Sequence, residues 1–310
     1  MKWEKMGKIV DHNMLDLPWF KKNAMVPLPY VKDDKTLRIF LTMCDAENVG
    51  RVGFVDVDIN DFTKILDYSR QPLIDIGDVG HFDDNGVVTS SLFEEDGKLY
   101  LFYSSYQTCV KVPYMIFTGL AVSTDNGDSF TKLTDEIPLL DRVPGECGTR
   151  CCSVVMKEGN KYRMWYTSDC QKGWIQTSAG RTKPFYDGKY MESDNLMTWP
   201  QGGQSSIPFI DPDEHGICSP SVWKEDGKYK MIYSIRYMSK GYRLGYAESD
   251  DGIHFTRMDD KVGIDVSDKG FDDDMVCYAE RISIGNETYL IYCGNHYGLD
   301  GIGYAKLVEK

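Results

Sequence analysis

Apolar runs recur along the chain at a nearly constant spacing. Five copies of one run end at aligned positions separated by 62, 63, 67 and 59 residues, namely Leu41, Tyr103, Tyr166, Tyr233 and Tyr292. In the clearest copy, Val87–Leu92 is followed by a Glu95-Asp96-Gly97-Lys98 turn and then by Leu99–Tyr103. This pattern is typical of a β-hairpin. Five copies at a similar period indicate a repeat architecture.

Each copy also contains signals for two further strands. Third strands are predicted at Gly119–Ser123 and Leu244–Glu248, each followed by an Asp- and Gly-containing turn. Fourth strands are predicted where an aromatic, a polar residue, a base and an aliphatic follow one another, at Phe62–Ile65, Phe130–Leu133 and Phe255–Met258. A four-stranded unit repeated radially is a propeller blade. The sequence therefore predicts an all-β, five-bladed β-propeller, with residues 1–310 as one domain and no long helix.

The two ends of the chain predict how the ring closes. The last copy stops after its third strand, Gly301–Lys306, whereas Trp3-Glu4-Lys5-Met6 has the fourth-strand pattern. We expect the N-terminal strand to complete the fifth blade and remove its exposed edge. The alternative is that Trp3 only fills the core.

Composition narrows the function classes. The net charge of −13 disfavours nucleic acid and anionic membranes as partners, because both require a basic face. No apolar run has the length of a signal peptide or membrane span, which predicts a soluble, cytoplasmic protein. The nine cysteines are scattered and odd in number, so buried free thiols are expected rather than disulfides. Their spacing fits no zinc template, and no metal site is predicted.

Acidic residues recur just ahead of the predicted innermost strands. Nineteen residues before the aligned ends stand Lys22, Asp84, Cys147, Glu214 and Asp273, and one extra residue in the third hairpin would make the third position Glu146. Because first strands line a propeller axis, these carboxylates are expected to converge at one mouth of the central channel. Neighbouring carboxylates shift each other's pKa values, as glycosidic bond cleavage requires. The alternative is that they are turn residues that cap backbone amides.

The repeat as a whole resembles the glycoside hydrolase superfamily that includes families 32, 43, 68 and 130. The resemblance rests on the acids before Val- and Ser-rich innermost strands and on hairpins ending in Tyr-Leu-Phe-Tyr or Met-Trp-Tyr. In families 32 and 43 it implies a base or nucleophile Asp in blade one, an Asp that stabilises the transition state or tunes pKa in blade two and an acid Glu in blade three. Asp84 matches blade two, and Glu146, followed by Cys147, matches blade three.

Blade one departs from that pattern. It carries Lys22 and Asn23 where an acid is expected, and an amide cannot accept a proton from water. The stretch Asn23–Pro27 is more similar to the Asn-Pro-Ala start of family 130, in which a blade-two Asp is the acid and phosphate attacks the sugar. That resemblance implies inorganic phosphate as co-substrate, and Arg150, His81, Arg236 and His296 are the candidates to bind it. Arg150 is equally suited to neutralise its acidic neighbours.

The remaining candidates concern binding. Tyr106 and Trp174 lie in long insertions, where an aromatic face suits a sugar ring, although loop aromatics also pack on neighbours. Asp273 belongs to an Asp272-Asp273-Asp274 run that suits sugar hydroxyls, a cation or solvent. No cofactor is predicted, apart from a structural cation in the channel or the phosphate named above.

Two hypotheses follow from these residues. The first is an enzyme that cleaves or transfers a glycosyl unit, with Asp84, Glu146 and Glu214 as catalytic residues and a carbohydrate or sugar phosphate as substrate. The second is a propeller that serves glycan biosynthesis by binding a sugar or sugar phosphate without hydrolysing it, because the blade-one base is missing.

Overall fold

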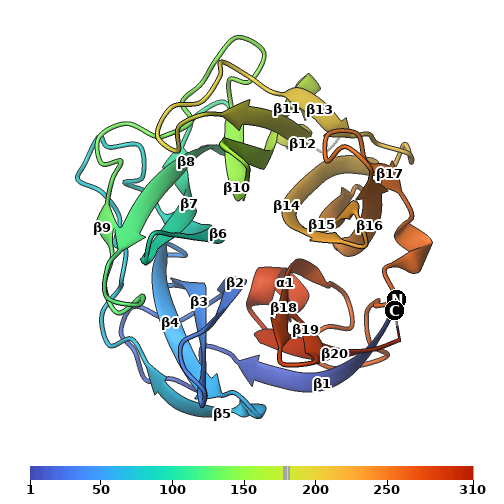
Figure 1. The fold of residues 1–310 in the computed structure, drawn as a ribbon. Helices are drawn as coiled ribbons and strands as arrows, with labels where there is room; N and C mark the ends of the chain where they lie inside the picture. The colour runs from blue at the N-terminus through green and yellow to red at the C-terminus, as the bar shows by residue number, and fades with distance from the viewer. Residues whose placement is uncertain (177–179, 181, 310) are drawn as a thin grey trace.

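The computed structural model describes residues 1–176, 180 and 182–309. Nearly all of the regular structure is β, as predicted, and the strands fall into five sets of four around a common centre (Figure 1). Each set is called a blade here and numbered in chain order. The described helices are the three-residue η1 (Asp259–Lys261) and the four-residue α1 (Asn295–Gly298). Neither has the length or apolar character needed to cross a bilayer.

The strand bounds follow the repeat. Blade one contains β2 (Ala24–Val31), β3 (Thr36–Cys44), β4 (Gly50–Asp58) and β5 (Asp61–Tyr68). Blade two contains β6 (Val87–Glu95), β7 (Lys98–Thr108), β8 (Tyr114–Ser123) and β9 (Thr131–Lys132). Blade three contains β10 (Thr149–Glu158), β11 (Lys161–Gln176), β12 (Thr182–Ser193) and β13 (Gln204–Ile207). Blade four contains β14 (Glu214–Glu225), β15 (Lys228–Tyr237), β16 (Arg243–Ser249) and β17 (Thr256–Arg257). Blade five contains β18 (Cys277–Ile284), β19 (Glu287–Cys293), β20 (Ile302–Glu309) and β1 (Lys2–Val10).

The N-terminal strand pairs with the last strand of the chain. β1 runs antiparallel to β20, from Lys2 opposite Glu309 to Val10 opposite Ile302. Figure 1 accordingly shows the two ends of the chain side by side. The Trp3 indole is also buried and donates a hydrogen bond to the Val262 carbonyl at 2.9 Å.

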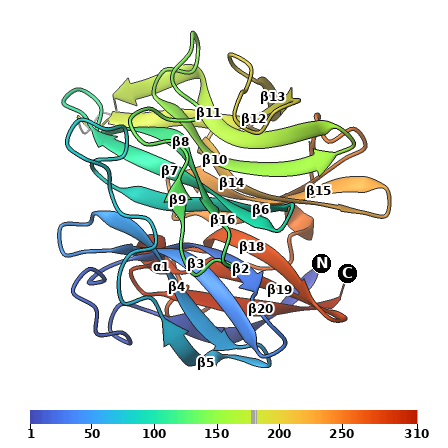
Figure 2. The same cartoon turned by 60° about the vertical axis from the view of Figure 1, so that its left-hand side comes forward.

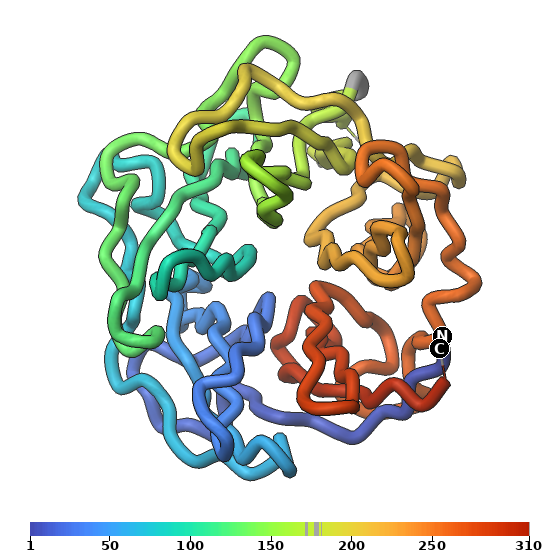
Figure 3. The backbone as a smooth tube through the Cα atoms, in the orientation of Figure 1, coloured from blue at the N-terminus to red at the C-terminus, as the bar shows by residue number. Residues whose placement is uncertain are grey.

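The described strands form three hydrogen-bonded sheets. Blades one and five are separate four-stranded sheets, whereas blades two, three and four share one twelve-stranded sheet. The links between these three blades are short parallel pairings, of β8 with β10 and of β12 with β14. The tube trace in Figure 3 shows the same five groups, and Figure 2 shows their strands from the side.

The hydrophobic core is divided among the interfaces between blades. Four buried apolar clusters are each shared by two consecutive blades, and a fifth joins blades one and five and also includes Tyr186, Cys218 and Tyr242 of blades three and four. Neighbouring residues of one second strand face opposite interfaces, as Phe40 packs with blade two and Leu41 with blade five. This is the two-residue period of a strand buried on both faces. It explains why the second strands are almost continuously apolar.

The innermost strands surround the centre. β2 contacts β6, β6 contacts β10, β10 contacts β14, β14 contacts β18, and β18 contacts β2. Residues at the ends of these five strands therefore meet although they lie far apart in the sequence.

Candidate functional site

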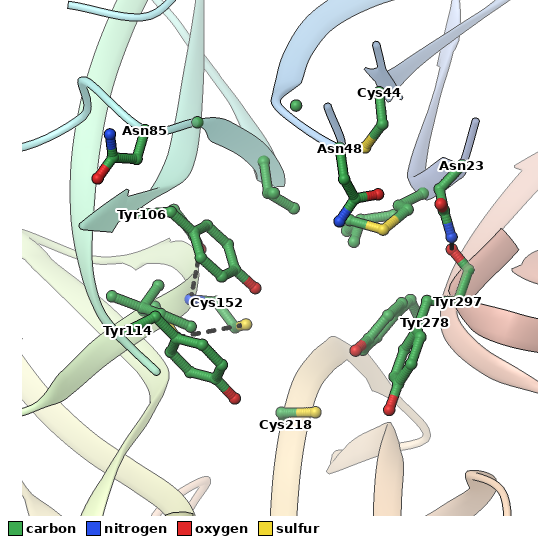
Figure 4. Close-up of a pocket in the computed structure, with 18 of the residues that line it drawn as sticks. Asn23, Cys44, Asn48, Asn85, Tyr106, Tyr114, Cys152, Cys218, Tyr278 and Tyr297 are labelled. Carbon is green, nitrogen blue, oxygen red and sulfur yellow. Dashed lines mark hydrogen bonds between the residues drawn. The ribbon is translucent and has the colours of Figure 1, made fainter. Parts of the chain in front are cut away.

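A cavity of about 700 Å³ lies where the five blades meet. Every blade contributes to its wall, with Asn23, Asp84, Cys152, Arg236 and Tyr278 as examples from blades one to five. Side chains reach into it from opposite sides, Tyr106 and Tyr114 from one and Tyr278 and Tyr297 from the other (Figure 4). The volume lies within the range of small-molecule sites.

The inner wall is built from β-bulges. Four of the innermost strands contain a non-glycine residue with a φ near +50°, namely Val26, Cys152, Ser219 and Tyr278. Each lies where the pairing with the next strand loses register. All four line the cavity. Because a bulge re-aims the side chains around it, these strands present residues to the cavity that regular pairing would turn aside.

Hydrogen bonds between blades hold the innermost strands at this level. The residue after each aligned position of the repeat is small and polar, and in four blades it accepts a hydrogen bond from an amide of the following blade. These bonds run from Thr89 to Thr42 (2.9 Å), from Cys152 to Ser104 (3.1 Å), from Tyr278 to Ser234 (2.8 Å) and from Val26 to Cys293 (3.2 Å). The last one joins blade five to blade one. The amides are thereby satisfied, and the cavity wall is pre-formed.

Tyrosines dominate the polar lining. Burial raises the pKa values of Tyr106, Tyr186, Tyr242 and Tyr278 well above the ordinary value. These phenols therefore stay protonated at neutral pH and can donate hydrogen bonds to a ligand. Aromatic faces with a polar tip suit the alternating apolar and hydroxyl surface of a sugar. Of these four tyrosines, the sequence analysis identified only Tyr106. Tyr186, Tyr242 and Tyr278 stand at different positions of the repeat, so no shared position marks them as a group.

Two carboxylates occur among the residues that line the cavity, Glu47 and Asp84. Asp84 is half-buried, and its Oδ2 accepts a hydrogen bond from the Gly80 amide at 2.9 Å. Glu47 is exposed in the turn between β3 and β4 and was not anticipated. The loops that carry the two acids are neighbours. Gly86, just after Asp84, packs so closely on Gly50, just after Glu47, that a Cβ atom at Gly86 would lie 3.4 Å from the Gly50 nitrogen.

The acids buried in blades two and five have a different environment. Asp83 accepts hydrogen bonds from the Tyr103 hydroxyl at 3.2 Å and from Lys132 at 2.7 Å. In blade five, Asp272 likewise accepts them from Tyr292 at 2.9 Å and from Lys5 at 2.6 Å. In both blades the tyrosine comes from the second strand and the lysine from the fourth. In each of these blades the acid, the tyrosine and the lysine therefore form one hydrogen-bonded group that connects the second strand with the fourth.

Glu146 and Glu214 occupy related positions in blades three and four. Glu146 accepts hydrogen bonds from the Tyr166 hydroxyl at 2.8 Å and the Gly203 amide at 3.0 Å, and its Oε2 lies 2.9 Å from Arg150 Nε. Both oxygens of Glu214 lie 2.7 Å from Arg257 of β17. Both side chains are at least 94% buried. Neither belongs to the cavity lining.

The expected convergence of Asp84, Glu146, Glu214 and Asp273 is therefore not observed. Of these four, Asp84 lines the cavity, and Asp273 lies outside it and accepts a hydrogen bond from Asn295 at 2.7 Å. In blades two and five the count of nineteen selects Asp84 and Asp273, whereas the buried acids are Asp83 and Asp272, one residue earlier. Blade one lacks the acid and also lacks the tyrosine, since Leu41 stands at the aligned position.

The binding candidates divide in the same way. Asn23, Tyr106, Arg236 and His296 line the cavity. The Asn23 amide donates hydrogen bonds to the His296 and Tyr297 carbonyls at 2.6 and 3.1 Å, which fixes the α1 turn beside the cavity.

Three other candidates lie outside the cavity lining. His81 lies 3.6 Å from Asp135, and Arg150 is paired with Glu146. The Trp174 ring packs against Tyr114 with centroids 5.4 Å apart. The prediction that these residues contact a ligand directly is not supported by their positions. Among the described residues, no three His, Cys, Asp or Glu side chains are grouped to hold a metal ion.

The sequence and the fold were compared with those of known proteins. No protein-family model matches the chain. It is 29% identical over 307 residues to the uncharacterized protein Rv1502 of Mycobacterium tuberculosis strain H37Rv, with 99% of each chain covered. A thermostable family-43 glycoside hydrolase superposes with a TM-score of 0.71 at 16% identity, over 94% of this chain and 92% of that one.

A second solved structure has a similar fold. The family-32 β-fructofuranosidase of Bombyx mori superposes with a TM-score of 0.61 at 17% identity, over 98% of this chain and 61% of that one. These likenesses extend over nearly the whole described chain and concern its backbone. The chain therefore has the β-propeller fold of the glycoside hydrolases of families 43 and 32.

Proposed function

We propose that the chain is a five-bladed propeller closed by β1, and that it is a carbohydrate-active enzyme which cleaves or transfers a glycosyl unit in the central cavity. The observation that carries the proposal is the position of Asp84, in a tyrosine-rich cavity at the centre of a fold shared with glycoside hydrolases. A sugar, free or phosphorylated, is the substrate class that this lining suits.

Asp84 is assigned the role of general acid. Its proton passes to the glycosidic oxygen while the bond between that oxygen and the anomeric carbon breaks, and the bonding electrons stay with the oxygen. Glu47 is the second carboxylate of the lining and is placed on a neighbouring loop. In hydrolysis it would take a proton from the water that attacks the anomeric carbon. The protonated tyrosines would bind sugar hydroxyls.

The proposal is tested by turnover of methyl glycosides and disaccharides, both anomers of common pentosides and hexosides, with and without inorganic phosphate, because their alkoxide leaving groups need a proton from a general acid. Asp84→Asn is expected to reduce turnover by about 100-fold or more, because loss of a general acid typically costs that much. Asp250→Asn, the same change at an exposed position outside the cavity, is the matched control. Unchanged turnover in Asp84→Asn would refute the assignment.

A second candidate function is sugar binding without turnover. It is favoured by the positions of Glu146 and Glu214, whose carboxylates are held in buried ion pairs away from the cavity. Thermal-shift measurements with sugars, combined with product analysis, separate the two functions. Binding with no product from any glycoside would support this second candidate.

A further inference from the structure

Arg236, which is partly buried, differs from the arginines whose side chains are almost fully buried. Arg38, Arg150 and Arg257 each lie within 3.0 Å of a carboxylate oxygen. Arg236 lines the cavity, and no carboxylate among the described residues lies within ion-pair distance of it. A guanidinium is always protonated, so this part of the cavity wall carries a positive charge with no described carboxylate in contact with it.

The groups around Arg236 are phenols. Its Nη1 donates to the Tyr186 hydroxyl at 3.4 Å, and its guanidinium lies 5.7 Å from the centre of the Tyr242 ring. The Tyr186 and Tyr242 hydroxyls are 2.9 Å apart. Tyr114 is a third neighbour: burial raises its pKa, and the nearby Arg236 opposes that rise. Since these phenols remain protonated, none of them balances the charge of Arg236.

His215 does not change this balance. It packs close to Arg236, and burial, the larger effect, together with the positive charge of Arg236 lowers its pKa to about 4. Its Nδ1 lies 2.9 Å from the Pro184 carbonyl oxygen. At neutral pH His215 is therefore uncharged and gives Arg236 neither a counterion nor a second positive charge. Of these two residues, only Arg236 carries a positive charge at neutral pH.

A partly buried charge without a counterion is costly, and a ligand can supply the missing charge. A guanidinium offers parallel N–H donors that match phosphate and carboxylate oxygens, and neutral phenols add O–H donors beside it. We propose that Arg236, with Tyr114 and Tyr186, forms an anion subsite in the central cavity, and that the sugar bound there carries a phosphate or carboxylate group. This inference rests on the proposed function for its sugar, but the subsite itself is defined by binding.

The test measures binding by isothermal titration calorimetry. The ligands are glucose, galactose and mannose, their 1-phosphates and their uronates, and inorganic phosphate alone. The protein is expected to bind one of the anionic sugars at least tenfold more tightly than its neutral counterpart, and a preference for phosphate or carboxylate identifies the group. Tight binding of inorganic phosphate alone would support the subsite with free phosphate as its occupant. If no anion binds more tightly than the neutral sugars, the proposal is overturned.

Two variants test whether Arg236 is the residue that binds the anion. Arg236→Gln is expected to lose at least tenfold in affinity for the anion and to keep its affinity for neutral sugars. Arg70→Gln, the same change at an exposed arginine outside the lining, should bind as the unmodified protein does. Anion affinity unchanged in Arg236→Gln overturns the proposal. If that variant does not fold, the comparison of anionic with neutral ligands on the unmodified protein still decides the question.

Asp84→Asn separates this inference from the proposed function. It should bind the anionic sugar normally and fail only in turnover. Turnover retained in Asp84→Asn, together with anion binding lost in Arg236→Gln, would refute the catalytic assignment and leave the subsite standing. The reverse pair of results would refute the subsite alone.

Discussion

Lys5 makes the same contact with Asp272 that Lys132 makes with Asp83, at 2.6 and 2.7 Å. Lys132 belongs to β9, the fourth strand of blade two, and Lys5 to β1 at the opposite end of the chain from Asp272. In each case the acid is almost fully buried and also accepts a hydrogen bond from the tyrosine of the second strand. β1 thus provides the lysine that pairs with the buried acid, as the fourth strand of blade two does, and it also occupies the hydrogen-bonded position of a fourth strand.

Replacing Lys5 tests the contribution of this contact to stability. Lys5→Met leaves the Asp272 carboxylate buried without its cation, and we expect the free energy of unfolding to fall by about 1–3 kcal/mol, less than for a fully buried pair because Lys5 is partly exposed. Urea denaturation provides the measurement. Lys2→Met, at an exposed position of the same strand, is the control, and equal stabilities for the two variants would contradict the expectation.

The stability of the protein should be much more sensitive to amide substitution at Glu214 than at Asp84. Glu214→Gln weakens a buried pair with Arg257, so we expect the free energy of unfolding to fall by about 3 kcal/mol. Asp84→Asn alters a half-buried side chain at the cavity and should change it by less than about 0.5 kcal/mol. Denaturation of both variants in parallel is the measurement. A Glu214→Gln protein of unchanged stability would favour a role for Glu214 other than the structural one.

Glu280 should make stability depend on pH. Burial raises its pKa to about 7, and the hydrogen bond from Ser221 Oγ at 2.7 Å opposes that rise only in part. In the unfolded chain this carboxyl loses its proton near pH 4.5, whereas in the folded protein it keeps the proton until about pH 7. The unfolded state therefore binds fewer protons across this window, and stability contributed by this group falls as the pH rises from about 4.5 to about 7.

The substitution Glu280→Gln removes that titration. We expect it to stabilise the protein by about 1–3 kcal/mol at pH 8 and to have little effect at pH 4.5. Thermal or urea unfolding of both proteins across this pH range is the measurement, with Glu136→Gln in an exposed loop as the control. A constant difference between the two proteins at all pH values would show that Glu280 does not titrate in this window.

Cys152 should be the reactive thiol of the cavity. Hydrogen bonds from the neighbouring Cys151 thiol and from Ser219 outweigh the effect of burial and lower the pKa of Cys152 to about 7. We expect its alkylation by iodoacetamide to rise with a midpoint near pH 7, against about 8.5 for an ordinary thiol. Peptide mass spectrometry measures modification of this residue, and Cys152→Ser identifies its peptide. A midpoint at or above 8.5 would show that the hydrogen bonds do not stabilise the thiolate.

The strand pattern could be predicted because it depends on local chemistry. A buried strand needs apolar residues, and the turn between two strands needs residues such as the Asp96-Gly97 pair, so each hairpin is visible in the sequence. The pairing of β1 with β20 was predictable for the same reason, since Trp3-Glu4-Lys5-Met6 has the fourth-strand pattern without three strands before it.

The site could be predicted only in part. The buried acids Asp83, Glu146 and Asp272 stand twenty residues before the aligned tyrosine of their blade, whereas Glu214 stands nineteen before it, so one fixed offset selects acids in different environments. Asp83 and Asp84 are adjacent, yet one is fully buried in its blade and the other lines the cavity. Tyr114 and Tyr186 come from third strands, and Tyr297 from the α1 turn, so no repeat position identifies them together. Only the packing of five blades brings these residues into one cavity.

The pairing of Lys2 with Glu309 has a consequence for the order of the chain. Because these two residues lie in one antiparallel ladder, residues 2 and 309 are close enough in space to be joined by a short linker. A circularly permuted gene that joins the present ends and opens the exposed hairpin at Gly159-Asn160 would encode the same contacts in a different sequence order.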